Sequence, residues 1–216
     1  MSGSRPNFRR DSAREGFVAD FLDYHLYPVY FESHRRVSDR REQLSGIDIR
    51  LRHESEEGEL LVDEKAATSW SHREIGTFAF ELSFFLDEEE YGGWFLDTEG
   101  RSKTTHWLCV WPRTTGGRIT SSEDIVSAEA TLLEARKMRH WVRRMGRLEQ
   151  KGLQDIVDQI RNNPSLNELE WAGLRVLISR NLPEQPVNLL LPKDVLRSLS
   201  GEMHWDLWAD YSMSVA

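Results

Sequence analysis

Two short apolar segments joined by a polar turn constrain the fold of this chain more than any other feature. Ile47, Ile49 and Leu51 alternate with charged residues, which predicts a strand with one apolar and one charged face. Residues 53–58 are polar and end in a glycine, and residues 60–67 then predict the second strand of a hairpin. Because charged residues seldom lie inside apolar strands, those of this hairpin are candidates for function.

Three of these charged residues, Asp48, Asp63 and Lys65, are predicted to meet on one face of the hairpin. Alternate residues of a strand share a face, so Asp63 and Lys65 point the same way, and Asp48 on the adjacent strand can project beside them. Carboxylates bind hard cations such as Mg2+, which takes further ligands from water and substrate phosphate. A bound cation lowers the pKa of a water, and a nearby Lys can orient that water or stabilise developing charge. The sequence therefore favours a site for phosphodiester hydrolysis.

At these residues the sequence resembles the PD-(D/E)XK nuclease superfamily, whose members are restriction-endonuclease-like. The pattern is an Asp at the start of one strand, then an acidic residue, any residue and a Lys on the next strand, and Asp48, Asp63 and Lys65 match it. The resemblance implies an α/β fold with a central mixed β-sheet flanked by helices, with a helix first, a β-meander next and a crossover helix later. It also implies a Mg2+- or Mn2+-dependent endonuclease that hydrolyses DNA phosphodiester bonds. Asp48 and Asp63 would bind the metal, and Lys65 would position or activate the nucleophile.

Two residues depart from the pattern of the superfamily. Ile47 stands where the superfamily name places Pro, and Glu64 is charged where small or apolar residues are more usual. Glu64 is predicted to face the opposite side of the sheet, but a one-residue bulge would turn it toward the metal, which makes it a reserve ligand. Glu15, in the first predicted helix, is either a further metal ligand or a residue that complements the helix dipole. Gln43 could orient a phosphate or a water.

Two clusters of basic residues stand out, because the formal net charge of the chain is -8. This charge argues against binding to nucleic acid through bulk charge, so a DNA partner must be met by local patches. Both clusters could guide a DNA backbone, although the second is equally well explained as a solvated helix face. The first cluster comprises Arg35, Arg36, Arg40 and Arg41, and the second forms a stripe of Arg136, His140, Arg143, Arg147 and Lys151.

Tryptophan is abundant, with 8 residues that include Trp70, Trp94, Trp107, Trp111 and Trp141. An exposed indole near a basic patch could stack on unpaired bases. Most of these side chains are expected in the core or in a lid, because large aromatic residues dominate burial.

The domain organisation is predicted to be a nuclease-like α/β core, residues 12–152, with a helical C-terminal extension, residues 153–216, packed on the same domain. Within the extension we expect a short helix at residues 153–160, a strand at residues 187–191 and a helix after Pro192. The sequence contains no internal repeat and no clean linker between domains. A separate second domain is therefore not favoured.

The remaining elements of the core follow from capping signals and apolar periodicity. Residues 1–11 are expected to form a loose arm, before a helix that Ser12 and Glu15 cap and that ends before Pro28. Thr120 and Glu123 repeat the capping spacing and predict a long helix to about Glu149.

Two further strands are expected between these helices. They cover residues 77–82 and 106–111, and the second is expected to end at Pro112. The acidic residues 87–90, followed by a Gly-Gly turn, are expected to be a solvated loop.

Cysteine usage and hydropathy indicate a cytoplasmic protein outside the membrane. The single cysteine, Cys109, cannot form an intrachain disulfide, and the apolar runs are far shorter than the roughly 20 residues that span a bilayer. Zinc-ligand spacing, a P-loop and a dinucleotide-binding turn are all missing from the sequence. A homodimer is possible, because cutting two strands commonly needs two sites.

Two other functions stay open at this point. One is a catalytically inactive nuclease-like domain that binds a nucleic acid or a protein partner. The other is a purely structural or assembly protein, in which the converging charges of the hairpin are accidental.

Overall fold

The computed structural model describes residues 6–96, 102–148 and 152–209, and the side chains of residues 13–96, 102–147 and 152–209. Its contacts group the chain into two compact units, each made of segments that are far apart in the sequence. The first unit comprises Met1–Ile75, Lys103–Glu134 and Ser200–Ala216, and the second comprises Gly76–Ser102 and Ala135–Leu199. The sequence-based division into residues 12–152 and 153–216 stays a prediction.

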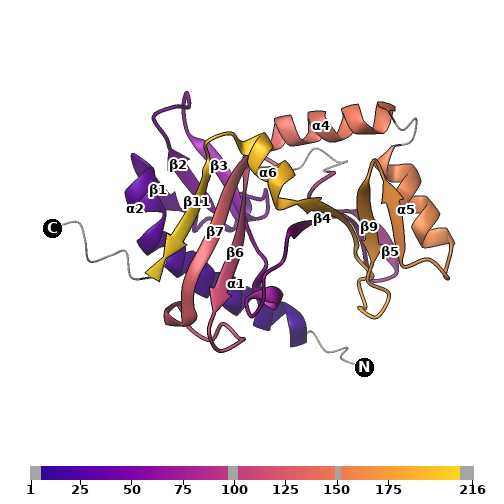
Figure 1. Cartoon of the computed structure of the whole chain (residues 1–216), viewed down its shortest axis with the longest axis horizontal. Helices are drawn as coiled ribbons and strands as arrows, with labels where there is room; N and C mark the ends of the chain where they lie inside the picture. Colours follow the sequence, from indigo (N-terminus) through magenta and orange to yellow (C-terminus); the bar gives the residue numbers. More distant parts are fainter. Residues whose placement is uncertain (1–5, 97–101, 149–151, 210–216) are drawn as a thin grey trace. The chain divides into compact units, whose positions relative to one another are not determined.

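Six strands of the described chain form a mixed sheet in the first unit (Figure 1). They are β1 (Ser33–Arg36), β2 (Ile49–Arg52), β3 (Leu60–Ala66), β6 (His106–Thr114), β7 (Ile125–Glu134) and β11 (His204–Trp208), in the order β1-β2-β3-β6-β7-β11. Neighbouring strands are antiparallel except β3 and β6, which are parallel. The helices of this unit are α1 (Pro6–His25), α2 (Tyr27–Tyr30) and α3 (Arg40–Gln43), with short 3-10 turns η1 (Thr68–Trp70) and η2 (Ser122–Asp124).

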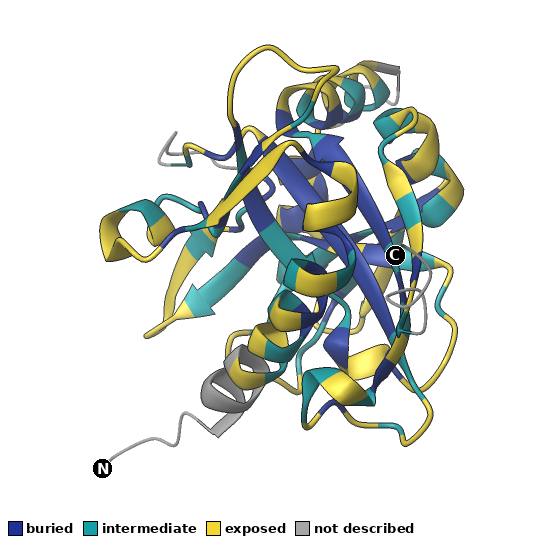
Figure 2. Cartoon of the chain, turned by 90° about the vertical axis from the view of Figure 1, so that its left-hand side faces the viewer, coloured by how far each residue is buried: buried dark blue, intermediate teal, exposed yellow. Residues whose placement is uncertain are grey.

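Helix α1 covers one face of this sheet and closes its core. Val18 and Leu22 of α1 belong to the same buried cluster as Val62 of β3 and Val110 of β6, and Leu22 is fully buried. Figure 2 shows strands that are largely dark blue, that is buried, and helices whose outer surfaces are yellow, that is exposed. One set of alternate residues on each strand belongs to this cluster and so faces α1, and the residues between them face the other side of the sheet. The set comprises Ile49 and Leu51 of β2, Leu60 and Val62 of β3, and Leu108 and Val110 of β6.

The second unit contains an antiparallel sheet of five described strands. They are β4 (Thr77–Leu86), β5 (Glu89–Gly92), β8 (Glu168–Trp171), β9 (Leu174–Ile178) and β10 (Val187–Pro192), in the order β5-β4-β10-β9-β8. Its helices are α4 (Ala135–Leu148), α5 (Leu153–Asn162) and α6 (Lys193–Ser200). Helix α5 buries Leu153, Ile156, Val157 and Ile160, the spacing of a helix that turns one face to a core.

The predicted α/β class, with a mixed sheet and flanking helices, is confirmed. The predicted hairpin is the antiparallel pair β2 and β3, and α5, β10 and α6 lie where the periodicity placed two helices and a strand. The extension is not confirmed as helical, because residues 153–209 also contain β8, β9, β10 and β11. A restriction-endonuclease-like core stays a prediction.

The long helix predicted from Thr120 to Glu149 is wrong over its first half. Residues 125–134 form β7, and α4 begins only at Ala135, while Glu149 lies outside the described residues. Residues 130–133 of β7 are all buried, so this part of the strand is covered on both faces and its apolar residues do not alternate. Their spacing of three and four residues then resembles that of an amphipathic helix.

Strand β6 does not end at Pro112 as predicted but continues to Thr114. Strand β3 pairs with β6 only as far as Val110, so beyond this residue β6 keeps β7 as its neighbour in the described sheet. A proline is tolerated there because its missing N–H breaks no hydrogen bond on the side that β3 has left.

The first helix begins at Pro6, earlier than the predicted cap at Ser12. Proline is favoured in the first turn of a helix because its missing N–H would have had no partner there. Ser12 and Glu15 therefore lie inside α1 and not at its N-terminus. Residues 1–5 of the predicted loose arm lie outside the described residues.

The acidic segment at residues 87–90 is exposed to solvent as expected, but it forms part of a hairpin and not an irregular loop. Asp87 and Glu88 form its turn with φ angles of 50° and 68°, in the left-handed region that tight hairpin turns require. Glu89 then begins β5, which pairs with the end of β4.

The packing of α1 on the sheet predicts the effect of two matched leucine substitutions. Leu22→Ala is expected to lower the free energy of unfolding by about 3 kcal/mol, because it leaves a cavity in the core. Leu44→Ala is the control, since Leu44 is 77% exposed, and its effect is expected to stay below about 0.5 kcal/mol. Urea unfolding followed by circular dichroism measures both values. Equal losses in the two variants would contradict the buried position of Leu22.

Candidate functional site

A tight turn between α3 and β2 places Asp48 at the start of its strand. Gly46 has a φ of 77°, a left-handed conformation that glycine adopts without a steric penalty. The Ile47 N–H donates to the Glu42 carbonyl at 3.2 Å, which closes the turn. The Asp48 N–H then donates to the Val62 carbonyl at 2.9 Å, which joins Asp48 to β3.

The β2 and β3 hairpin brings the three predicted catalytic residues together. Asp48 is joined to the Val62 carbonyl, one residue before Asp63, and its carboxyl group lies close enough to that of Asp63 to raise the pKa of Asp63. Asp63 and Lys65 lie on the same face of β3, and the Lys65 Nζ is 2.7 Å from the Asp63 Oδ1. Two carboxylates and one ammonium group therefore converge, as the sequence predicted.

Burial and like charge control the titration of Asp63. Its side chain is only 8% exposed, and this burial raises its pKa to about 7. The neighbouring Asp48 raises the pKa further, while the ion pair with Lys65 opposes the shift. For Lys65, burial disfavours the charged form, but Asp63, Asp48 and Glu15 outweigh it, and the pKa of Lys65 is raised. Lys65 is therefore protonated at neutral pH.

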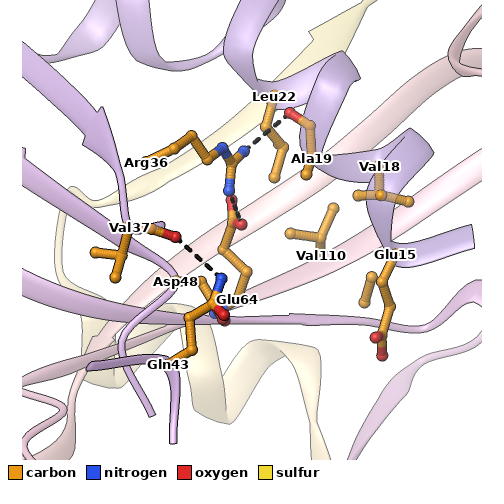
Figure 3. A pocket seen from close by; sticks show the side chains of 12 residues that line it. Glu15, Val18, Ala19, Leu22, Arg36, Val37, Gln43, Asp48, Glu64 and Val110 are labelled. Carbon is orange, nitrogen blue, oxygen red and sulfur yellow. Dashed lines mark hydrogen bonds and ion pairs between the residues drawn. The ribbon is translucent and has the colours of Figure 1, made fainter. Parts of the chain in front are cut away.

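A cavity of about 310 Å3 adjoins Asp48 on the side of the sheet that α1 covers (Figure 3). Its polar lining comprises Glu15, Arg36, Gln43, Asp48 and Glu64, and its apolar lining includes Val18, Leu22, Ala66 and Val110. Asp63 and Lys65 lie on the opposite face of β3 and do not line it. Asp48 connects the two faces, because its Oδ2 accepts a hydrogen bond from the Glu64 N–H at 2.9 Å.

The side chain of Glu64 is held by an internal network on the α1 side of the sheet. Its carboxylate accepts hydrogen bonds from the Tyr27 hydroxyl and from the Arg36 guanidinium. Arg36 also donates from Nε to Asp23 at 2.9 Å. Its Nη2 donates to the Ala19 carbonyl at 2.9 Å (Figure 3). Burial raises the pKa of Glu64, against the opposing effect of Arg36 and Tyr27.

This network involves Glu64, which the sequence predicts as a reserve metal ligand. β3 pairs with both neighbouring strands without a register shift, so the bulge that would turn Glu64 toward Asp63 is not present. The Glu64 carboxylate is already engaged by Tyr27 and Arg36, which gives it a structural role. A metal-binding role for Glu64 stays a prediction.

The two remaining predicted residues near the hairpin both line the cavity. Glu15 is an exposed residue of α1, and its charge contributes to the raised pKa of Lys65. Gln43, at the end of α3, donates from Nε2 to the Val37 carbonyl at 3.0 Å (Figure 3). Their roles toward a metal, a phosphate or a water stay predictions.

The predicted basic clusters separate into exposed and internally paired residues. Arg35 of β1 and Arg40 and Arg41 of α3 are exposed, whereas Arg36 is occupied by the network of Asp23 and Glu64. In the second unit, the exposed residues of the stripe on α4 are Arg136, His140, Arg143 and Arg147. Lys151, the last residue of the predicted stripe, lies outside the described residues.

The sequence did not reveal the network that surrounds Glu64. Its members come from α1, α2, β1 and β3, and no local spacing connects them. The sequence places Arg36 in a DNA-binding patch because it stands in a cluster of basic residues just before the candidate site. The one available signal is Glu64 itself, a charged residue predicted to face the side of the sheet opposite to Asp63.

Within the described part of the chain, no group of three or more His, Cys, Asp or Glu residues is arranged to hold a metal ion. The candidate site accordingly offers two carboxylates, Asp48 and Asp63. Among the described helices, none combines the length and the apolar character needed to cross a membrane.

Comparison with known proteins gives no match, whether with protein-family models, with curated proteins or with solved structures. The chemistry of the hairpin is therefore the basis for a functional proposal.

The pKa of Asp63 predicts a pH dependence of stability in metal-free buffer. Its folded pKa of about 7 exceeds the ordinary value of 3.8, so between these pH values the folded protein holds a proton that the unfolded chain has released. The bound proton contributes its full stabilisation below the ordinary pKa of 3.8, and this stabilisation is lost as the pH rises to about 7. Within this window the free energy of unfolding is expected to fall by at most about 1.4 kcal/mol per pH unit.

Asp63→Asn removes this titration, so the stability of the variant relative to the wild type is expected to rise through the same pH window and then level off. Urea unfolding at a series of pH values in EDTA measures the difference. Asp20→Asn, at an exposed residue of α1, is expected to keep the wild-type profile. A constant difference between wild type and Asp63→Asn would contradict the raised pKa.

Proposed function

We propose that this protein is a Mg2+- or Mn2+-dependent endonuclease of the PD-(D/E)XK type that hydrolyses DNA phosphodiester bonds. The observation that carries the proposal is the convergence of Asp48, Asp63 and Lys65 at one end of the β2 and β3 hairpin. These are the residue types, in the order along the chain, that the resemblance assigns to the reaction. The function is thus inferred from the site and not from the fold alone.

The order of elements in the first unit supports the proposal in part. Helix α1 comes first, the antiparallel strands β1, β2 and β3 follow, and β6 then joins β3 in parallel. One connection differs from the expected arrangement, because the chain passes from β3 to β6 through β4 and β5 of the second unit rather than through a helix.

The donor set fits a divalent cation. Asp48 and Asp63 are adjacent carboxylates, and the charge of Asp48 raises the pKa of Asp63, so a cation shared by the two would favour the ionised form of both. Mg2+ is usually held by one or two carboxylates, with waters and substrate phosphate as its other ligands. When bound, it would polarise the phosphate and lower the pKa of a water.

The role of Lys65 follows from its charge. Because the pKa of Lys65 is raised, its amine carries three protons at neutral pH and has no lone pair with which to act as a base. It can donate hydrogen bonds to a phosphate oxygen or to the attacking water, and it can stabilise the negative charge that develops in the transition state. We therefore assign to Lys65 the positioning of the nucleophile and the stabilisation of charge.

Cleavage assays with single variants test the proposal. Asp48→Asn, Asp63→Asn and Lys65→Met are each expected to lower the cleavage rate at least about 100-fold, because each removes a charge that faces the reacting phosphate. The substrates are supercoiled plasmid, linear duplex and single-stranded DNA, each with Mg2+, Mn2+ or EDTA. Gel electrophoresis measures the products.

The control for these assays is Asp20→Asn, which changes a carboxylate of α1 outside the hairpin and should cut like the wild type. Wild-type rates in the Asp63→Asn variant, or no cleavage of any substrate by the wild type with either metal, would contradict the nuclease proposal. If the wild type binds DNA but neither cleaves it nor binds Mg2+ in calorimetry, the protein is instead an inactive nuclease-like binding domain.

The exposed basic residues are proposed to guide the DNA backbone. Arg35, Arg40 and Arg41 stand on the elements that precede Asp48 in the first unit. The residues of the α4 stripe stand on a helix of the second unit, where successive turns bring them to one face. Basic side chains in such arrays neutralise phosphates and make binding dependent on salt.

Two arginines of α4 provide a quantitative test of this role. The double variant Arg143→Ala with Arg147→Ala is expected to weaken duplex DNA binding and to reduce the salt slope by about 2, one for each lost phosphate contact. Fluorescence anisotropy across a salt series in EDTA measures the slope. Arg175→Ala is the control, because Arg175 is an exposed arginine of β9 and not of α4. Its Nη1 lies 3.6 Å from Oε2 of Glu168, so it forms an ion pair within its own sheet. An unchanged slope in the double variant would show that α4 does not contact phosphates.

A further inference from the structure

The turn η1, directly after β3, carries a tryptophan at the surface of the first unit. Trp70 is 44% exposed, whereas Trp107 and Trp111 of β6 are almost fully buried. The guanidinium carbon of Arg73 lies 4.2 Å from the centroid of the Trp70 ring. The His72 ring is roughly parallel to the indole, with centroids 6.5 Å apart. This part of the surface therefore presents an indole with a cation over it.

The backbone around Trp70 is fixed by hydrogen bonds. The Trp70 N–H donates to the Ala67 carbonyl at 3.1 Å, and the Arg73 N–H donates to the Trp70 carbonyl at 3.1 Å. The Ala67 N–H donates to the Val110 carbonyl of β6 at 2.9 Å, which anchors the turn to the sheet. The indole is thus held outward by an ordered turn, which reduces the entropy that a ligand must offset on binding.

The position of Trp70 along the chain places it near the candidate site. Lys65 belongs to β3 and Trp70 to the turn that follows it, so the two Cα atoms are at most about 18 Å apart even if the intervening chain were fully extended. Along the axis of a DNA duplex, successive phosphates of one strand are spaced about 3.4 Å apart. A strand with a phosphate at Lys65 can therefore reach Trp70 within a few nucleotides.

An exposed indole beside a guanidinium suits one ligand chemistry particularly well. Nucleobases stack on aromatic side chains whatever their sequence, and an arginine adds a stacking plane and a positive charge for the phosphate. A paired base inside a duplex offers no free face, so such stacking selects unpaired nucleotides. A protein or membrane partner would need a wider apolar surface than one indole.

We propose that Trp70 and Arg73 form a stacking platform for an unpaired nucleobase of the bound strand. The platform makes single-stranded DNA, or a single-stranded segment next to a duplex, the preferred substrate class. This inference rests on the proposed nuclease function for its biological use, but base stacking can be measured without cleavage.

The test compares single-stranded and duplex binding in EDTA, with a fluorescein-labelled oligothymidylate and a blunt duplex. Trp70→Ala is expected to weaken binding of the single strand about 10-fold and to leave the duplex nearly unchanged, while Trp70→Phe keeps most of the affinity. The single strand is also expected to quench the intrinsic fluorescence of the wild type more than that of Trp70→Phe. The matched control is Trp208→Ala, because Trp208 of β11 is 56% exposed in the same unit and is expected to have no effect.

Unchanged binding of the single strand in Trp70→Ala, or an equal loss with the single strand and the duplex, would overturn the platform while leaving a Mg2+-dependent nuclease intact. A selective loss in Trp70→Ala from a protein that never cleaves DNA would support the platform and reject the catalytic proposal. A wild type that binds neither form of DNA would overturn both.

Discussion

The electrostatic repulsion between two neighbouring carboxylates is the constraint around which the hairpin of the first unit is organised. The hydrogen bond from the Asp48 N–H to the Val62 carbonyl holds Asp48 near Asp63 despite their like charges, and burial makes the repulsion stronger than it would be in water. Lys65 relieves part of it through its ion pair with Asp63. Such an unfavourable arrangement is typical of sites that a ligand completes, and this argues for a functional rather than a structural hairpin.

The two faces of β3 carry different sets of charged groups. On the side of α1, the Glu64 carboxylate accepts hydrogen bonds from Tyr27 of α2 and Arg36 of β1, and Arg36 also donates to Asp23 of α1. On the other side, Asp63 and Lys65 face each other as an ion pair. The backbone joins the two faces, because the N–H of Glu64 donates to the carboxylate of Asp48. The orientation of Asp48 is therefore tied to the backbone at Glu64.

The success of sequence-based prediction depended on how local each signal was. The period of two around Asp48 and Asp63 is a local pattern, and it predicted both the hairpin and the meeting of the three charged residues. Strand β7 was mistaken for a helix because a strand buried on both faces loses that period. The network of Asp23, Tyr27, Arg36 and Glu64 escaped prediction because its members meet only after the chain has folded. The exposure of Trp70 was equally hidden, since an indole in the sequence looks the same whether it is buried or exposed.

The mixed sheet of the first unit is assembled from stretches that leave the ribosome at different times. β6 can join β3 only after residues 67–105 have been made, and β11 can pair with β7 only after residues 135–203 have followed. Pairings between such distant stretches carry a large loop-closure entropy and slow the folding of a nascent chain. Until β11 is in place, the outer edge of β7 exposes unpaired backbone groups. A partly synthesised chain is therefore open to strand exchange with its neighbours, and chaperone protection matters most during this interval.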